Sequence, residues 1–110
     1  MILTCTEYQH MAARTINRLA DNLTNTALGL AGEAGEVADI IKKITCQGHP
    51  LTDEVRARLA EELGDIGWYL ALGCTTLGID MGDVLAANIA KLRKRYPDGF
   101  STDRSVNRDE

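Results

Sequence analysis

The sequence contains few residues that break helices and almost no pattern typical of strands. Its two prolines, Pro50 and Pro97, lie between or after the segments with helical periodicity. No alternation of β-branched and polar residues, the pattern that would predict strands, runs for more than a few positions. These absences argue against a β-sheet protein and predict an all-α fold.

Clustered cysteines, long apolar runs and an excess of basic residues are also missing. The three cysteines are scattered and form no CxxC or other metal-binding spacing, which predicts reduced thiols in a cytoplasmic protein. No apolar run approaches the ~20 residues that a membrane helix needs, and the N-terminus lacks the features of a signal peptide. With a net charge of −4, we expect neither nucleic acid nor a membrane as a partner.

The common nucleotide-binding and histidine-based metal motifs are absent as well. There is no GxxxxGK[ST] and no GxGxxG, which excludes a P-loop and a Rossmann site. His10 and His49 stand in no Glu-x-x-His spacing, which argues against a ferritin-like di-iron centre. We interpret both histidines as ordinary polar residues.

What the sequence does contain is helical periodicity over most of its 110 residues, the length of one domain. The periodicity and helix-end signals predict four helices, over residues 6–20, 25–46, 52–77 and 80–96. We expect residues 1–100 to form the domain and residues 101–110 to be a polar, mobile tail. A chain of this length buries a modest core and often gains stability from oligomerisation.

Two of these helices carry acidic residues on the face that should be buried. At ~100° per residue, Glu33 falls inside the apolar stripe of its helix and Glu36 falls at the edge. Glu62 and Asp65 repeat this arrangement on the next helix. Asp39, by contrast, falls on the outer face, where an acidic residue needs no special explanation.

The two acidic stretches align with each other, Glu33-Ala-Gly-Glu36-Val with Glu62-Leu-Gly-Asp65-Ile. This repeat predicts two antiparallel helices related by pseudo-symmetry. Buried, unpaired carboxylates are strongly unfavourable, and four at one seam would repel each other unless a cation lay between them. A set of oxygen ligands alone favours Mg²⁺, with Mn²⁺ as a substitute, over zinc. Salt-bridged polar helix faces are the alternative, which a single ExxE would favour but two copies do not.

Glycines recur beside these acidic residues. Gly35 and Gly64 each precede the second acidic residue of a motif. Because an interior glycine costs roughly 1 kcal/mol relative to alanine, we infer that this pair allows close approach of the two helices beside the metal. Gly29 is expected to ease packing against the first helix.

The last predicted helix carries a polar line on its inward side. Asn88 lies in the apolar stripe, and Lys91 and Arg95 follow on the same side. These groups suit a polyphosphate, because Arg offers bidentate donors and Lys a point charge. Lys43 lies close to the direction of Glu36 and could act likewise. The helix macrodipole explains basic residues near a helix C-terminus, but it does not explain Asn88.

Carboxylates that hold Mg²⁺, next to phosphate-binding donors, describe a nucleotide-phosphate site. Trp68 and Tyr69 follow Asp65 closely in the sequence. Either ring could stack on a nucleobase, and packing in the core or at an oligomer contact is an equally good interpretation of each.

In these motifs the chain resembles the MazG-like nucleoside triphosphate pyrophosphohydrolases of the all-α NTP pyrophosphatase superfamily. The family pattern is ExxE, a spacer and ExxD, and residues 37–61 form the spacer here. The resemblance covers about residues 8–100 and includes the stretches LAGEAGEVADIIKK, EELGDIGWYLA and NIAKLRKRYPDGF.

The resemblance implies a helical protomer that assembles into homodimers or homotetramers, with active sites in the bundle near subunit interfaces. The implied reaction is Mg²⁺-dependent hydrolysis of a (deoxy)nucleoside triphosphate between the α- and β-phosphates. The metal ligands carried over are Glu33, Glu36, Glu62 and Asp65, and the phosphate or sugar contacts are Lys43, Asn88, Lys91 and Arg95. A carboxylate that the metal does not fully occupy, Glu36 or Glu61, would accept the proton of the attacking water.

Two other functions are compatible with the same residues. The chain could be a non-catalytic helical oligomer that only binds nucleotide or metal. It could also be a relative with a narrower substrate, such as dUTP, dCTP or phosphoribosyl-ATP.

Overall fold

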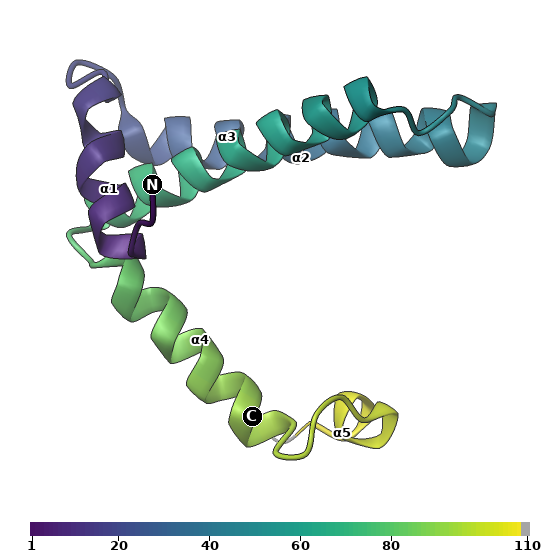
Figure 1. Cartoon of the computed structure of the whole chain (residues 1–110). Coiled ribbons are helices and arrows are strands. Elements are labelled where there is room, and N and C mark those ends of the chain that lie inside the picture. Colours follow the sequence, from purple (N-terminus) through teal and green to yellow (C-terminus); the bar gives the residue numbers. More distant parts are fainter. Residues whose placement is uncertain (109–110) are drawn as a thin grey trace.

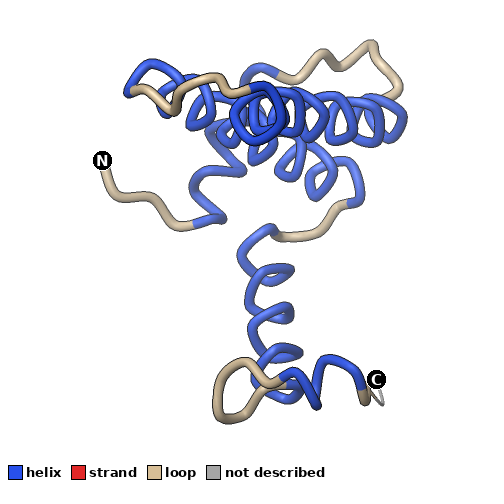
Figure 2. Tube along the Cα trace, turned by 90° about the vertical axis from the view of Figure 1, so that its right-hand side faces the viewer, coloured by secondary structure: helices blue, strands red, loops and turns tan. Residues whose placement is uncertain are grey.

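The computed structural model describes residues 1–108, which form helices joined by short connections (Figure 1). No strand occurs among these residues, and Pro97 and Gly99 form one isolated bridge (Figure 2). The predicted all-α fold is therefore confirmed. In chain order the elements are α1 (Cys5–Ala12), the 3₁₀ helix η1 (Ala13–Thr15), α2 (Asn22–Gln47), α3 (Asp53–Leu77), α4 (Met81–Arg95) and α5 (Thr102–Val106).

The first helix is shorter than predicted. Its start is a capping box, in which the side chain of Thr4 accepts from the backbone N–H of Glu7 and the Glu7 carboxylate accepts from the Thr4 N–H. Its end lies at Ala12, where the chain continues as the 3₁₀ helix η1 and then becomes extended at Ile16. Beyond it, the side-chain oxygen of Asn17 accepts from the backbone N–H of Leu19 at 3.0 Å, a local bond that competes with a helix. The predicted extension over residues 16–20 is therefore wrong.

The other predicted helices are present, with ends set by side-chain caps and glycines. Asp21 caps α2, so this helix starts three residues earlier than expected. Thr52 caps α3 and Asp80 caps α4. Helices α2 and α3 end at Gly48 and Gly78, whose φ values of 72° and 70° favour glycine.

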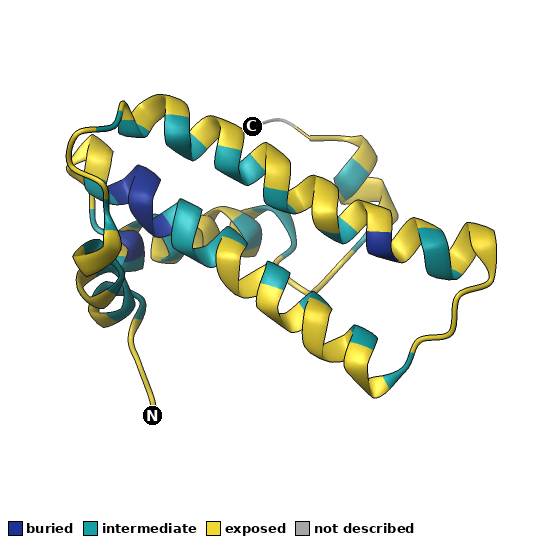
Figure 3. Ribbon diagram, turned by 90° about the horizontal axis from the view of Figure 1, so that it is seen from above, coloured by how far each residue is buried: buried dark blue, intermediate teal, exposed yellow. Residues whose placement is uncertain are grey.

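Helices α2 and α3 form a long antiparallel pair, as the repeated motif predicted, and they share the most extensive contact in the molecule (Figure 3). Their closest approach is not where we expected it. A Cβ at Gly29 would overlap the ring of Tyr69, and one at Gly73 would lie 2.8 Å from Cγ2 of Thr26. A Cβ at Gly35 or Gly64 would meet no atom within 4 Å. The helices therefore pack most tightly away from the acidic residues, and the inferred role of Gly35 and Gly64 is wrong within one chain. Gly29 faces α3 and not the first helix.

The buried core is small and lies where α3 meets α1 and the start of α4. Ala71, Cys74 and Met81 form its centre, and Ile40 is a separate buried residue further along α2 (Figure 3). Several large apolar side chains stay exposed on the long helices, among them Leu28, Leu63 and Ile89. A single chain of this length leaves much apolar surface in water.

One side chain of α1 holds the turn between α3 and α4. Gln9 donates from Nε2 to the backbone oxygen of Ile79 at 2.9 Å and to Oγ1 of Thr75 at 3.2 Å. Its Oε1 accepts from the backbone N–H of Met81 at 2.7 Å. These bonds fix the place at which α4 turns through 105° from α3 and leads away from the α2–α3 pair (Figures 1 and 2).

Among the described residues, no single helix has both the length and the apolar character needed to span a membrane. Helices α3 and α4 pass that test only when they are joined across their bend.

The segment predicted as a tail contains a short helix that the sequence analysis did not predict. Ser101 caps α5 by accepting from the backbone N–H of Arg104 at 3.3 Å. The rings of Tyr96 and Phe100 pack beside it, with centroids 5.5 Å apart. The mobility of residues 101–110 stays a prediction, and residues 109–110 lie outside the described part of the chain.

The contrast between the glycines can be tested with two matched substitutions. Gly29→Ala should lower the free energy of unfolding by about 1–3 kcal/mol, because the new methyl group displaces the Tyr69 ring. Gly35→Ala has open space and should raise the free energy of unfolding by about 0.5–1 kcal/mol through helix propensity. Urea unfolding in metal-free buffer measures both. Equal effects of the two substitutions would contradict the packing described here.

Candidate metal and nucleotide-phosphate site

The α2–α3 pair brings three of the predicted acidic residues together. Glu33 on α2 and Glu62 and Asp65 on α3 each offer one carboxylate oxygen, and these oxygens lie within 4.8 Å of one another. Glu33 and Glu62 are half-buried, and Asp65 is exposed. The first acidic residue of each motif thus faces the seam and the second lies at its edge, as the helical periodicity indicated.

The other two acidic candidates lie outside this group of three. Glu36 is exposed one turn further along α2, yet it is near enough for its charge to raise the pKa of Glu33. Glu61 is exposed beside Glu62 on α3. Neither carboxylate is enclosed by the protein, so both are accessible to water.

The facing carboxylates change the protonation of Glu33. Its pKa is raised from 4.5 to about 7, first because its protonated side chain hydrogen-bonds to Glu62. Loss of water around it and the negative charges of Glu62, Asp65 and Glu36 act in the same direction. In the metal-free protein, a proton on Glu33 therefore relieves part of the repulsion at the seam.

The same arrangement fits a hard divalent cation. Neighbouring oxygens around Mg²⁺ lie about 3–4 Å apart, which small rotations of these three side chains can reach from separations within 4.8 Å. The group contains only carboxylate oxygens, a donor set that suits Mg²⁺ or Mn²⁺ better than zinc. A cation here would take the place of the proton on Glu33.

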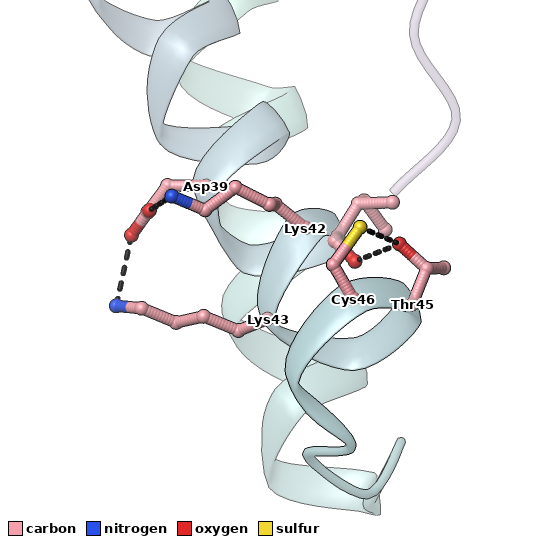
Figure 4. Close-up of polar contacts among 6 residues, drawn as sticks. Asp39, Lys42, Lys43, Thr45 and Cys46 are labelled. Atoms are coloured by element: carbon pink, nitrogen blue, oxygen red, sulfur yellow. Dashed lines mark hydrogen bonds and ion pairs between the residues drawn. The ribbon is translucent and has the colours of Figure 1, made fainter.

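Lys43 lies beyond the acidic residues on α2 and is held by Asp39. Its Nζ lies 2.9 Å from Oδ2 of Asp39, and Nζ of Lys42 lies 3.6 Å from Oδ1 of the same carboxylate (Figure 4). Lys43 is the first cause of the lowered pKa of Asp39. Asp39 is thus an outer-face acid, as expected. A phosphate-binding role for Lys43 stays a prediction.

The polar line on α4 is not brought to the acidic residues within one chain. Asn88 and Lys91 are exposed, and α4 packs only its first turns against α1 and the end of α3. The rest of α4 extends away from the α2–α3 pair (Figures 1 and 2). Arg95, near its end, lies with its guanidinium carbon 5.8 Å from the ring centroid of Tyr96.

Comparison with known proteins identifies the family. The profile described as the MazG nucleotide pyrophosphohydrolase domain matches residues 21–100. The chain belongs to this family. A curated relative, Gene 37 protein of Mycobacterium phage L5, is 36% identical over 89 residues, covering 80% of this chain and 78% of the phage protein. No solved structure matches.

The resemblance inferred from the sequence is therefore confirmed. The matched residues include both acidic motifs and the polar line of α4.

In this MazG-family chain, the two aromatic candidates make contacts within the protein. Trp68 donates from its indole nitrogen to Oγ1 of Thr15 at 2.9 Å, and the Tyr69 ring covers Gly29. The two rings meet edge to face, with centroids 5.1 Å apart. These contacts give both rings a structural role, and their stacking on a nucleobase stays a prediction.

Arg58 and His49 line a small cavity between α2 and α3, together with Lys43. Arg58 was not among the predicted site residues, and His49 was interpreted as an ordinary polar residue. A signal was available for Arg58, because it precedes Glu62 by four residues and so shares its helix face. His49 lies in the loop after α2, where helical periodicity gives no information.

The raised pKa of Glu33 predicts how stability depends on pH. Between pH 4.5 and about 7 the unfolded chain loses the Glu33 proton while the folded chain keeps it. The unfolded state then binds fewer protons, so the free energy of unfolding should fall as pH rises through this range. In Glu62→Gln this fall should be smaller, because the charged partner is gone.

Thermal unfolding in EDTA from pH 5 to pH 8 measures this effect. Glu61→Gln is the matched control, since it removes the same charge from the neighbouring position on α3. It should keep the wild-type dependence on pH. An unchanged pH dependence in Glu62→Gln would contradict the assignment.

Proposed function

We propose that this MazG-family protein hydrolyses nucleoside or deoxynucleoside triphosphates between the α- and β-phosphates, with Mg²⁺. The products are the nucleoside monophosphate and pyrophosphate. The observation that carries the proposal is the convergence of Glu33, Glu62 and Asp65, from both acidic motifs, at one seam. The family match supports the reaction class.

In this proposal Glu33, Glu62 and Asp65 hold the cation, with Glu36 completing the set from the seam's edge. When bound, Mg²⁺ neutralises phosphate charge and lowers the pKa of a coordinated water. The acidic residues come from two helices that are packed together along their length. Their positions are therefore fixed before substrate arrives, which is the main requirement for phosphoryl transfer.

A proton acceptor for the attacking water is available at the edge of the same group. Glu36 and Glu61 are both exposed, so either carboxylate could accept a proton. Glu36 is the better candidate, because its charge acts on Glu33. Glu61 is not among the groups that raise the pKa of Glu33.

We further propose that Asn88, Lys91 and Arg95 serve the site of a second copy of the chain. Within one chain, α4 leads away from the acidic residues (Figure 1). The exposed apolar side chains on α2, α3 and α4 supply surface for association. A homodimer or homotetramer would then bring the positive charges of one protomer to the phosphates bound by another.

The reaction can be tested by pyrophosphate release from a panel of NTPs and dNTPs with Mg²⁺. Glu33→Gln and Glu62→Gln should each lower kcat/KM by about a hundredfold or more, because each removes a metal ligand. Glu54→Gln, an exposed acid in the first turn of α3, should stay close to wild type. Full activity in both ligand variants would falsify the site. Nucleotide binding with no product in the wild type would instead favour the non-catalytic alternative.

The contribution of a second copy can be tested by subunit mixing. Co-expressed Glu62→Gln and Lys91→Ala chains form some mixed dimers, in which one site has wild-type acidic residues and a wild-type α4. About a quarter of wild-type activity should return, since half of randomly formed dimers are mixed and each has one intact site.

Glu33→Gln mixed with Glu62→Gln is the control, because both changes affect the acidic half of the site. That mixture should stay inactive. Absence of recovery with Lys91→Ala would show that α4 does not act across subunits.

A further inference from the structure

The seam between α2 and α3 changes the sign of its charge along its length. The acidic group lies toward its middle, and a basic cavity of about 50 Å³ lies further toward the loop that joins the two helices. The cavity draws residues from α2, from that loop and from α3. They are Ile40, Lys43, Ile44, His49, Val55 and Arg58.

The cavity combines an apolar floor with a polar rim. Ile40 is buried, and Ile44 and Val55 are half-buried, so the floor offers no hydrogen bonds. The groups at the rim can be cationic or donate hydrogen bonds. A volume of about 50 Å³ exceeds the ~10–15 Å³ of free space that one water needs, so the cavity can hold one small group such as a phosphate. Charge interactions above an apolar floor are less screened than in bulk water.

Arg58 has no acidic partner among residues 1–108. Glu62 is four residues further along the same face, a spacing at which Arg and Glu often pair. In this structure Arg58 and Glu62 nevertheless do not form an ion pair. The planar guanidinium of Arg58 therefore remains available at the cavity rim, with donors suited to a phosphate oxygen pair.

The spacing along α3 matches an extended polyphosphate. On α2, Lys43 stands roughly 15 Å along the helix from Glu33, and its side chain reaches back toward Glu33 as far as Asp39. At 1.5 Å of rise per residue, Arg58 stands roughly 6 Å along α3 from Glu62. This is the scale of a chain of linked phosphate groups. A substrate held by the acidic group can thus extend along the seam to the cavity without leaving the surface of the α2–α3 pair.

We propose that Arg58 and His49, together with Lys43, bind the terminal phosphate of the triphosphate, one end of the pyrophosphate that leaves. This inference rests on the proposed function and extends its site by two residues. With these residues, each chain has its own cationic groups that bind the pyrophosphate leaving group. Residues Asn88, Lys91 and Arg95 of a second copy would then contact the phosphates nearer the acidic group.

The direct test is calorimetric titration of the full chain with inorganic pyrophosphate in Mg²⁺ buffer. Arg58→Ala and His49→Ala should each raise the Kd for pyrophosphate, by about tenfold or more for Arg58. Arg58→Lys should recover part of the loss, because it restores the charge but not the bidentate donors. Arg56→Ala is the matched control, since Arg56 is exposed on the same helix and does not line the cavity.

The outcomes separate this inference from the proposed function. Weakened binding in Arg58→Ala with wild-type binding in Arg56→Ala supports the cavity, even if no triphosphate is hydrolysed. In active protein, Arg58→Ala should also raise KM for the triphosphate. Equal binding by Arg58→Ala and Arg56→Ala, or no pyrophosphate binding by the wild type, overturns the inference. If Arg58→Ala and Arg56→Ala bind pyrophosphate equally while the wild type still hydrolyses triphosphates, only this inference fails, and the proposed function is unaffected.

Discussion

The repulsion between carboxylates at the α2–α3 seam is the constraint on which the rest of the structure depends. Glu33 and Glu62 face each other from two packed helices, and Asp65 lies within reach of both. Such a group is stable only when something neutralises part of its charge. In the chain alone, a proton on Glu33 does so. A divalent cation would do the same more completely, and the oxygen donors are suited to it.

Packing elsewhere in the molecule supports that seam. The tight contacts of Gly29 with Tyr69 and of Gly73 with Thr26 lock the two helices near α1, where the buried core also lies. The seam around the acidic residues is left with open space beside its glycines. The helices are thus held together at one end and leave room for ligand or a second protein surface further along. Gln9 completes the arrangement by fixing the direction in which α4 leaves.

Much of this could be read from the sequence, because helices are governed by local rules. Periodicity and caps located α2, α3 and α4, and the angular position of Glu33 correctly placed it at the seam. The errors arose where other interactions decided the outcome. The first helix ended early, at a 3₁₀ turn followed by an extended Ile16. Gly35 seemed to imply close packing, but in the structure its neighbours are too distant for contact. Arg58 went unnoticed because its significance depends on residues of another helix and a loop.

The sequence by itself determined the helical class, the repeated acidic motif and the chemistry of its donors. These follow from residue type and from spacing along one helix. The tertiary structure alone decided which acidic residues meet, that the pKa of Glu33 is raised, and that α4 turns away from them. It also placed Lys43, His49 and Arg58 around one cavity. The physical reason is that charge interactions and packing act between atoms that are close in space, and in this chain those atoms come from segments far apart in sequence.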